Sequence, residues 1–318
     1  MFLGVDSSCY TTSLAVTDYR GNILQDERKI LPVPPGQQGL QQSRAFFYHT
    51  RNYPELMEKV FSISKGLELQ GVAVSSKPRP LEGSYMPVFT AGLAVARNIA
   101  ALLGIPLLET THQEGHLAAG LWSAGVLELE KFLALHLSGG TTELLLAEQT
   151  EKKPLRFSIK VLGEAYDISA GQLVDRVGVA MGLPFPAGLA LERQARECAA
   201  DAKVIIPSFV KGYRMSFSGA ETLAKSYLQK GIAADKVARG IEHCIAATIE
   251  KVTRRAIEET GIRDVLAVGG VAANGYIRRR LIRGLEHRAV GGKIHFPQAE
   301  YCSDNAVGVS LIARSIIL

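Results

Sequence analysis

Cysteine is scarce in this sequence, with 4 residues among 318, and no two of them form a Cys-x-x-Cys pair. Such sparse spacing argues against a zinc knuckle and against a disulfide framework, and it suits a reducing compartment. No apolar run reaches the roughly 18 residues of a membrane-spanning helix, because glycine, arginine or histidine interrupts each long one. The opening segment, MFLGVDSSCY, lacks the basic stretch and apolar core of a secretory signal. We therefore expect a cytoplasmic protein that binds no membrane.

Charged side chains are also sparse at 21%, whereas hydrophobic residues make up 47% of the chain and no segment is of low complexity. A chain of this length and composition can bury one large core or two medium cores, and two is the better expectation. The formal net charge of +5 permits an acidic partner such as RNA but does not demand one.

Hydrophobic periodicity and turn residues predict an alternation of strands and helices, which is typical of an α/β protein. The predicted strands span residues 2–5, 12–17, 23–29, 71–75, 132–137, 142–147, 157–162 and 265–268. The predicted helices span residues 53–64, 89–103, 170–181, 220–229, 234–259 and 305–317, and residues 31–43 are predicted to form a loop.

Two segments of the chain resemble each other. VDSSCYTTSLAV at residues 5–16 and HLSGGTTELLLA at residues 136–147 both predict a strand, a loop of small residues, a Thr-Thr pair and a returning strand. Two copies of one hairpin, each heading an α/β half, are what a duplicated domain would show. We therefore expect an N-terminal lobe over residues 1–128 and a C-terminal lobe over 129–318. A return of the last helix onto the first lobe stays open.

The sharpest local motif is THQEGH at residues 111–116. Thr111 and Glu114 have the spacing of a capping box, which predicts that a helix begins at His112. His112 and His116 then lie one turn apart on one helix face, where they can share a divalent metal ion. Because a helix N-terminus disfavours the imidazolium form, both rings should be neutral and able to bind the ion. Two surface histidines that merely share a face remain the alternative.

The same motif argues against a zinc peptidase. In His-Glu-x-x-His enzymes a glutamate directly follows the first histidine and activates the metal-bound water, whereas Gln113 stands at that position here. The inverted order of those residues is absent from the sequence as well. Peptide hydrolysis by that mechanism is therefore not expected.

Two glycine turns form the second motif, Ser138-Gly139-Gly140 after a predicted strand and Gly269-Gly270 before a predicted helix. Glycine lets backbone amides approach phosphate oxygens, and a helix N-terminus favours negative charge. Neither turn is a Walker loop or a dinucleotide fingerprint, and an ordinary tight turn would explain each one alone. Together with the Asp6-Ser7-Ser8 hairpin, however, they match a two-domain nucleotide clamp.

Two acidic residues complete the candidates. Asp175, on a predicted helix, could accept hydrogen bonds from ribose hydroxyl groups. Asp304 stands just ahead of the last predicted helix, where an aspartate suits the N-cap and could equally bind a metal ion. Taken alone, the capping role of Asp304 is favoured.

At these residues the sequence resembles the tRNA threonylcarbamoyladenosine synthase (TsaD) family, and the similarity keeps the order of the family's motifs nearly end to end. Nucleotide contacts implied by the resemblance fall on Ser138, Gly139, Gly140, Asp175, Gly188, Glu192, Gly269, Gly270 and Asn274. The resemblance also implies an iron or zinc ion bound by His112, His116 and Asp304. His136 stands where some relatives have a metal-proximal tyrosine, which suggests a fourth ligand.

The resemblance further implies the actin/sugar-kinase/heat-shock-ATPase fold, with an adenine nucleotide held between two lobes. Such enzymes pass a threonylcarbamoyl group from threonylcarbamoyl-adenylate to an adenosine of tRNA. The metal ion would act as a Lewis acid, and the glycine turns would hold the departing AMP. Partners would be tRNA and other proteins of the threonylcarbamoyladenosine pathway.

The sequence also departs from the family pattern. Tyr10-Thr11 replaces an Asp-Glu pair, Lys77-Pro78-Arg79-Pro80 replaces Gly-Pro-Gly, and Pro186-Ala187-Gly188 replaces Pro-Gly-Gly. The residues implied for metal and nucleotide are kept, whereas those at the presumed acceptor end are not. We interpret the chain as a divergent paralog of the transferase. Two alternatives stay open: a non-catalytic nucleotide-binding scaffold, and a carbamoyltransferase that acts on another acceptor.

Overall fold

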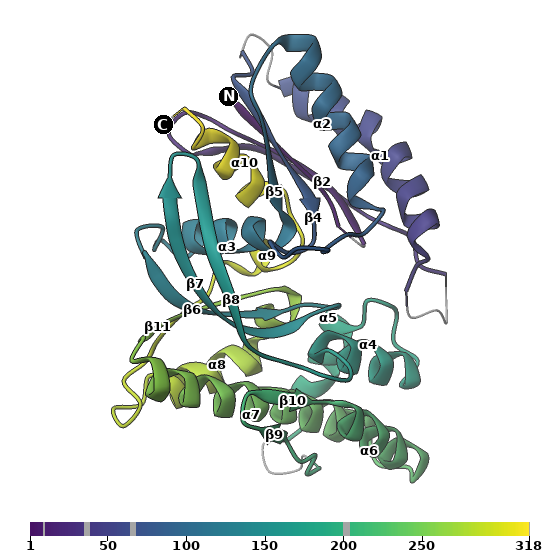
Figure 1. The fold of residues 1–318 in the computed structure, drawn as a ribbon. Helices are drawn as coiled ribbons and strands as arrows, with labels where there is room; N and C mark the ends of the chain where they lie inside the picture. The colour runs from purple at the N-terminus through teal and green to yellow at the C-terminus, as the bar shows by residue number, and fades with distance from the viewer. Residues whose placement is uncertain (9, 35–38, 64–67, 200–203, 318) are drawn as a thin grey trace.

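The computed structural model describes residues 1–8, 10–34, 39–63, 68–199 and 204–317. These residues form two five-stranded sheets, stacked one above the other in Figure 1, with helices on their outer faces and between them. Within this described part, no helix is both long and apolar enough to cross a membrane.

The upper sheet has the strand order β3-β2-β1-β4-β5. Its strands are β1 (Phe2–Ser7), β2 (Thr11–Thr17), β3 (Ile23–Ile30), β4 (Gly71–Lys77) and β5 (Leu107–Thr111). Strands β1, β2 and β3 are antiparallel neighbours, whereas β4 runs parallel to β1, and β5 runs parallel to β4. The carboxyl ends of β1, β4 and β5 therefore meet at one edge of the sheet.

The lower sheet repeats this arrangement, with the order β8-β7-β6-β11-β12. Its strands are β6 (Lys131–Leu137), β7 (Thr142–Lys152), β8 (Leu155–Glu164), β11 (Asp264–Val268) and β12 (Lys293–His295). The two similar segments of the sequence form the matching hairpins: Ser7 lies opposite Thr12 in β1–β2, and Leu137 lies opposite Thr142 in β6–β7. The predicted repetition of the hairpin is thus present in the fold.

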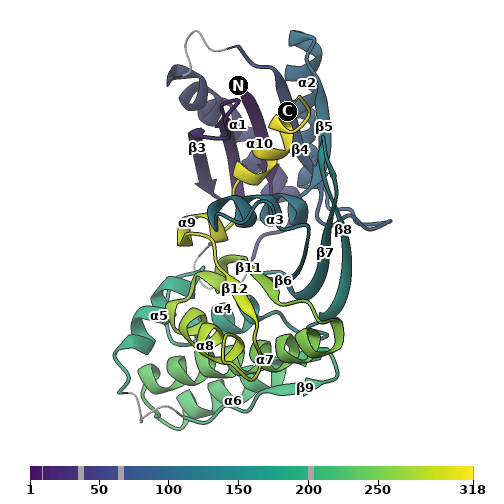
Figure 2. The same cartoon turned by 90° about the vertical axis from the view of Figure 1, so that its left-hand side faces the viewer.

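The helices cover the sheets in layers. They are α1 (Gln42–Ile63), α2 (Phe89–Leu103), α3 (His112–Ser123), α4 (Ala170–Ala180), α5 (Gly188–Arg196), α6 (Ser218–Gln229), α7 (Ala234–Thr260), α8 (Gly275–Leu285), α9 (Ala299–Cys302) and α10 (Val307–Arg314). Helices α1 and α2 pack on the outer face of the upper sheet, and α4, α5, α7 and α8 cover the outer face of the lower one. Helices α3 and α10 lie between the two sheets (Figure 2).

The contact between α3 and α10 is unusually close because glycines face each other there. A Cβ atom placed on Gly308 would lie only 1.8 Å from the backbone oxygen of Gly115. Helix α10 also touches the upper sheet, since a Cβ atom on Gly4 of β1 would lie 2.3 Å from the backbone nitrogen of Ser310. These contacts bring the start of α3, the end of β1 and the segment before α10 into one small region.

Several element boundaries differ from the prediction. Helix α1 begins at Gln42 rather than near Tyr53 and runs through Pro54. Ala45, Tyr53 and Leu56 are all buried, which shows that one apolar stripe continues across the proline. The predicted end of this helix at residue 64, like residues 35–38 of the predicted loop, lies outside the described residues.

The sequence did not predict the short strands β5 and β12, the two-stranded sheet of β9 (Phe209–Lys211) and β10 (Arg214–Ser216), or helix α5. The last predicted helix is shorter than expected: α10 begins at Val307, and α9 precedes it. The predicted lobe boundary at residue 128 falls between α3 and β6, and the division into two domains there stays a prediction.

Candidate metal centre

Helix α3 begins at His112, as the sequence predicted, because a capping box closes its first turn. Thr111 Oγ1 accepts a hydrogen bond from the Glu114 backbone nitrogen at 3.2 Å, and Glu114 Oε2 accepts one from the Thr111 backbone nitrogen at 3.0 Å. His112 and His116 therefore lie one turn apart on the same face, with their Nε2 atoms 3.1 Å apart. The prediction of a paired histidine face is confirmed.

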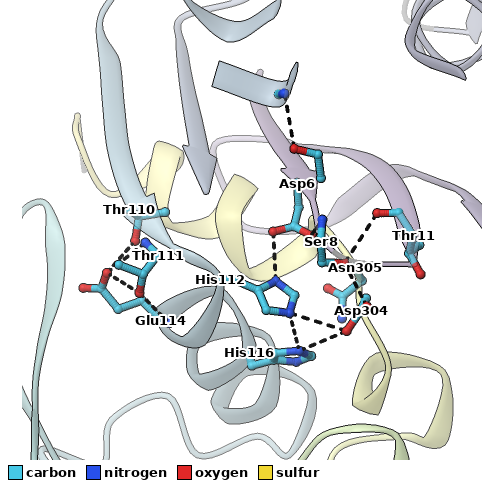
Figure 3. Close-up of polar contacts among 12 residues, drawn as sticks. Asp6, Ser8, Thr11, Thr110, Thr111, His112, Glu114, His116, Asp304 and Asn305 are labelled. Carbon is cyan, nitrogen blue, oxygen red and sulfur yellow. Dashed lines mark hydrogen bonds and ion pairs between the residues drawn. The ribbon is translucent and has the colours of Figure 1, made fainter. Parts of the chain in front are cut away.

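Asp304 joins this pair from the segment between α9 and α10, as Figure 3 shows. Its Oδ1 atom lies 3.5 Å from His112 Nε2 and 3.4 Å from His116 Nε2. One ligand atom from each of the three residues lies within 4.8 Å of the others, which suits a shared cation. The favoured capping role of Asp304 is wrong, because Ala306 is the N-cap of α10 and Asn305 Oδ1 accepts the hydrogen bond from Val307 at 3.0 Å.

The end of β1 orients two members of this group (Figure 3). Asp6 Oδ1 lies 2.9 Å from His112 Nδ1, and Asp6 Oδ2 accepts a hydrogen bond from the Ser8 backbone nitrogen at 3.2 Å. Ser8 Oγ in turn donates to Asp304 Oδ2 at 2.8 Å. Sequence reasoning placed Asp6 and Ser8 in a nucleotide hairpin and missed this role. The signal that could have found it is their position at the carboxyl end of a strand parallel to the one before His112.

The charges of the two rings depend on burial and on the neighbouring carboxylates. Burial opposes a charge on His112, but the Asp6 and Asp304 carboxylates outweigh it and raise the pKa of His112 to about 10. Burial and the neighbouring His112 lower the pKa of His116. The lowered pKa of His116 agrees with the expected neutral ring, whereas the buried carboxylate that faces Nδ1 of His112 favours a proton on that nitrogen and leaves Nε2 directed at Asp304 and His116. Although burial acts the other way, the two histidines hold the pKa of Asp304 well below its usual range.

His136, at the end of β6, lies next to the group but outside its tight cluster. Its ring centroid is 5.1 Å from that of His116, and only 5% of its side chain is exposed. Burial and His116 keep the pKa of His136 well below its ordinary value, so the ring is neutral. Both of its ring nitrogens are buried without a hydrogen-bond partner in the described structure, as is His116 Nδ1. Buried, neutral and unpaired imidazole nitrogens fit a nearby cation.

The first predicted glycine turn is a tight loop after β6. Ser138 donates its backbone N–H to Thr141 O at 2.8 Å, and the Thr141 backbone nitrogen donates to Ser138 Oγ at 3.1 Å. A Cβ atom on Gly139 or Gly140 would meet no heavy atom of the described structure within 4 Å, so this backbone borders open space. Open glycine backbone is the feature that lets a phosphate group approach amide donors.

The second glycine turn lies directly beside the first. Gly269 has a φ of 95°, and a Cβ atom there would lie 2.3 Å from Leu137 O at the end of β6. Gly171, at the start of α4, is equally close to the first turn, since its Cβ atom would lie 2.4 Å from Ser138 O. Gly270 borders open space. The two predicted turns and the start of α4 thus form one continuous glycine-rich surface.

Asp175 and Gly188 meet a short distance along α4. Asp175 Oδ1 accepts a hydrogen bond at 2.8 Å from the backbone nitrogen of Ala187, the residue before Gly188. Gly188 begins α5, and a Cβ atom there would meet no described heavy atom within 4 Å. Asp175 therefore fixes the turn that starts α5, a role that the sequence did not indicate.

Glu192 and Asn274 are joined through the turn before α8. Glu192 Oε1 accepts a hydrogen bond from the Gly275 backbone nitrogen at 3.1 Å. Asn274 Oδ1 caps α8 by accepting from the Ile277 backbone nitrogen at 3.0 Å, and Asn274 Nδ2 donates to Glu242 Oε1 at 2.6 Å. The structure thus brings together the residues predicted to hold a nucleotide. Sequence reasoning missed Glu242, which lies on the buried face of α7.

Comparison with known proteins gives consistent results. The family described as TsaD, tRNA N6-adenosine threonylcarbamoyltransferase, matches residues 37–310. A tRNA N6-adenosine threonylcarbamoyltransferase from Archaeoglobus fulgidus is 29% identical over 308 residues, which cover 97% of this chain and 88% of that protein. A probable bifunctional tRNA threonylcarbamoyladenosine biosynthesis protein from Methanothermobacter thermautotrophicus is 28% identical over 99% of this chain and 55% of its own length.

Solved structures show the fold. Full-length HypF in its phosphate- and nucleotide-bound form aligns with a TM-score of 0.59 and 16% identity, over 99% of this chain and 46% of HypF. A ROK family glucokinase from Streptomyces griseus aligns with a TM-score of 0.53 and 12% identity, over 98% of this chain and 99% of the glucokinase. The chain has the two-lobed actin/sugar-kinase/heat-shock-ATPase fold, as the sequence resemblance implied.

Proposed function

This chain belongs to the tRNA N6-adenosine threonylcarbamoyltransferase family, and from that premise we propose that it transfers a threonylcarbamoyl group from threonylcarbamoyl-adenylate to an adenosine of tRNA. The observation that carries the proposal is the convergence of His112, His116 and Asp304 from two distant parts of the chain. A scaffold that only binds nucleotide would not need three such residues around one point.

We propose that these three residues hold an iron or zinc ion and that His136 supplies a fourth ligand. The donor set of imidazole nitrogens and one carboxylate suits either ion. Asp6 fixes the ring of His112 through Nδ1, so that Nε2 faces the centre, and Ser8 fixes Asp304. When bound, the ion supplies Lewis-acid polarisation of the carbamoyl oxygen.

The glycine-rich surface is proposed to hold the adenylate. The backbone amides of Gly139, Gly140 and Gly270 border open space and can face its phosphate group. Asp175, Gly188, Glu192, Gly269, Asn274 and Ser138 complete the proposed nucleotide site. In the transfer, the amino nitrogen of the acceptor forms a bond to the carbamoyl carbon and gives up one proton to solvent water, and the bond from that carbon to the phosphate oxygen breaks. AMP leaves with the electron pair, and amide donors stabilise its charge.

A second candidate function is the transfer of a carbamoyl-type group to an acceptor other than tRNA. The residues at the presumed acceptor end of the site favour it. In place of the acidic pair of the family pattern, the ring of Tyr10 packs edge-on against Phe185, with centroids 5.7 Å apart. An aromatic contact there offers neither the charge nor the proton acceptors of two carboxylates. For either acceptor, we propose that other proteins of the threonylcarbamoyladenosine pathway supply the adenylate, in the cytoplasm.

Two measurements test the proposal. Metal analysis of purified protein should find one bound iron or zinc ion in the wild type and a loss in His112→Ala, whereas His287→Ala, which removes an exposed histidine, should retain it. Nucleoside analysis of tRNA after incubation with threonine, bicarbonate, ATP and an adenylate-forming partner should show threonylcarbamoyladenosine. Metal binding without modified tRNA would favour another acceptor, and no metal in the wild type would argue against the catalytic proposal.

A further inference from the structure

Arg79 lies at the edge of the candidate metal centre, on the loop that leaves β4. This loop rests against the first turn of α3, because the Gln113 backbone nitrogen donates to Pro78 O at 3.0 Å. In the upper sheet, Lys77 is in register with Thr111, the residue before His112. The position of Arg79 is thus tied to the helix that carries the two histidines.

A buried carboxylate holds the Arg79 side chain from one side. Arg79 Nη1 donates to Glu143 Oε1 at 2.5 Å, and the Glu143 side chain is only 2% exposed. Gln113 Nε2 donates to the other oxygen, Glu143 Oε2, at 2.8 Å. Because Gln113 holds the second oxygen, Glu143 has a fixed place, and its first oxygen anchors the Nη1 end of the guanidinium group.

The other side of the guanidinium group is accessible. The Arg79 side chain is 39% exposed, and within the described residues Nη1 is its only guanidinium nitrogen that makes a hydrogen bond. Arginine has five N–H donors in a planar fork, so a second edge can pair with another carboxylate. An arginine held at one edge by a buried partner is preorganised for such pairing.

Arg79 also lies close to the proposed ligands. Glu143 Oε2 is 3.9 Å from His136 Nδ1, and the His136 ring adjoins that of His116. Gln113, which holds Glu143, directly follows His112 in the sequence. The guanidinium group is therefore separated from the candidate metal centre by a single layer of side chains.

Resting on the proposed function, we propose that Arg79 binds the carboxylate of the transferred group and so selects a carboxylate-bearing carbamoyl donor over an unsubstituted one. In a threonylcarbamoyl group, the carboxylate is separated from the carbamoyl carbon by one nitrogen and one carbon atom. A carbamoyl group at the metal centre therefore places the carboxylate within a side chain's reach of the ligands. At this distance from the proposed ligands, Arg79 offers a positive charge and, within the described residues, guanidinium nitrogens that make no other hydrogen bond.

The test compares two stable adenylate analogues by calorimetric titration, one carrying the threonylcarbamoyl group and one carrying carbamoyl alone. In Arg79→Ala, affinity for the first should fall about ten- to hundredfold, because a charge-assisted pair is lost, while affinity for the second stays unchanged. Arg79→Lys should lie between, and Glu143→Gln should also weaken the first analogue selectively. Arg97→Ala, which removes an exposed arginine paired with Glu109, is the matched control.

The outcomes separate the two proposals. Equal weakening of both analogues in Arg79→Ala, or no change in either, would overturn the selective role and leave a structural ion pair. If Arg79→Ala does not fold, as judged by thermal unfolding, the same comparison is made in Arg79→Lys. A selective loss of affinity for the threonylcarbamoyl analogue then supports the proposal, and an equal change for both analogues overturns it. If the wild type binds neither analogue nor AMP, the proposed function itself fails, and the inference fails with it.

Discussion

Asp6 links the end of β1 to the candidate metal ligand His112 through its carboxylate group. Asp6 is fully buried, and its Oδ1 atom faces His112 Nδ1 at 2.9 Å. Carboxylates in this position fix the ring orientation and raise the basicity of the binding nitrogen. Its role therefore depends on charge as well as on shape.

We expect Asp6→Asn to lower the affinity for iron or zinc about ten- to hundredfold, because the isosteric amide keeps the shape but removes the charge. Competition with a chelator of known affinity measures the effect. Glu55→Gln, which removes an exposed carboxylate paired with Lys29 of β3, should leave the affinity unchanged. An unchanged affinity in Asp6→Asn would show that the carboxylate does not act on the ligand.

The raised pKa of Glu242 should make the stability of the folded chain depend on pH. Burial raises the pKa of Glu242 from its ordinary value of 4.5 to about 7, although hydrogen bonding from Asn274 and the charge of Arg239 oppose the shift. The folded state thus holds the proton more tightly than the unfolded state, so stability falls as pH rises from 4.5 to about 7 and then levels off. In Glu242→Gln this decrease should be absent.

Urea denaturation at about pH 5 and about pH 8 measures the effect. The stability of Glu242→Gln relative to the wild type should rise between these values, by up to about 3 kcal/mol for a shift of this size. Glu258→Gln, which changes an exposed glutamate on the same helix, should show no such trend. A constant difference across this range would mean that Glu242 ionises normally.

At the residue scale, the sequence predicts what depends on local spacing. The capping box and the histidine pair follow from positions three and four residues apart, and both are present. The role of Asp304 could not be read locally, because aspartate suits a cap and a metal ion equally well. Only the folded chain shows that Ala306 is the N-cap of α10, that Asn305 accepts the hydrogen bond from Val307, and that Asp304 faces His112 and His116.

At the element scale, the contact between α3 and α10 determines where Asp304 lies relative to the histidines. A Cβ atom on Gly308 would lie 1.8 Å from Gly115 O, a backbone atom that cannot rotate away. We expect Gly308→Ala to reduce the free energy of unfolding by about 1–3 kcal/mol or more, as overpacking does. It should also weaken metal binding, because the helices must move apart.

Chemical denaturation and metal titration measure the two effects of Gly308→Ala. Gly219→Ala is the matched control, since a Cβ atom there would meet no described heavy atom within 4 Å. Alanine at that position of α6 should be neutral or stabilising. Equal stability of the two variants would show that the crossing can relax without cost.

Elements with strong local signals were predicted well. Helix α2 spans the predicted residues, and Gly104 ends it in the left-handed conformation. The short strands β5 and β12 were missed because three to five residues carry too little periodicity. Helix α1 begins at Gln42, before its predicted start near Tyr53, and its buried residues lie on both sides of Pro54. Its continuous buried stripe, which becomes visible only after folding, holds the helix together across the proline.

At the scale of the whole molecule, two sheets with the same strand order enclose α3 and α10 (Figure 2). The sequence showed the repeated hairpin, but not that residues near positions 6, 112 and 304 would meet. That meeting depends on parallel strands whose ends share an edge, and on tight helix crossings between the sheets. Neither has a local pattern in the sequence.

The contact between Tyr10 and Phe185 joins two regions of the molecule that carry different proposed roles. Tyr10 lies between β1 and β2, two residues after Ser8 of the metal centre, and Phe185 precedes the turn that Asp175 fixes. The edge-on pair has its centroids 5.7 Å apart, and a Cβ atom on Gly39 would lie 2.8 Å from the Tyr10 hydroxyl oxygen. Each aromatic pair of this kind contributes about 0.5–1.5 kcal/mol beyond its buried area.

We expect Tyr10→Ala to favour more open arrangements of the two sheets. It should also weaken AMP binding up to about tenfold, because the energy of the lost aromatic contact no longer helps to hold the two sheets in the arrangement that binds AMP. Small-angle scattering and calorimetric titration measure the two effects, and Phe185→Ala should reproduce them. Tyr85→Ala, which removes an exposed tyrosine, should change neither. Because the pair acts as a unit, the double variant Tyr10→Ala, Phe185→Ala should be no weaker than either single variant. Additive losses would instead assign the two rings separate roles, one at the nucleotide and one at the acceptor.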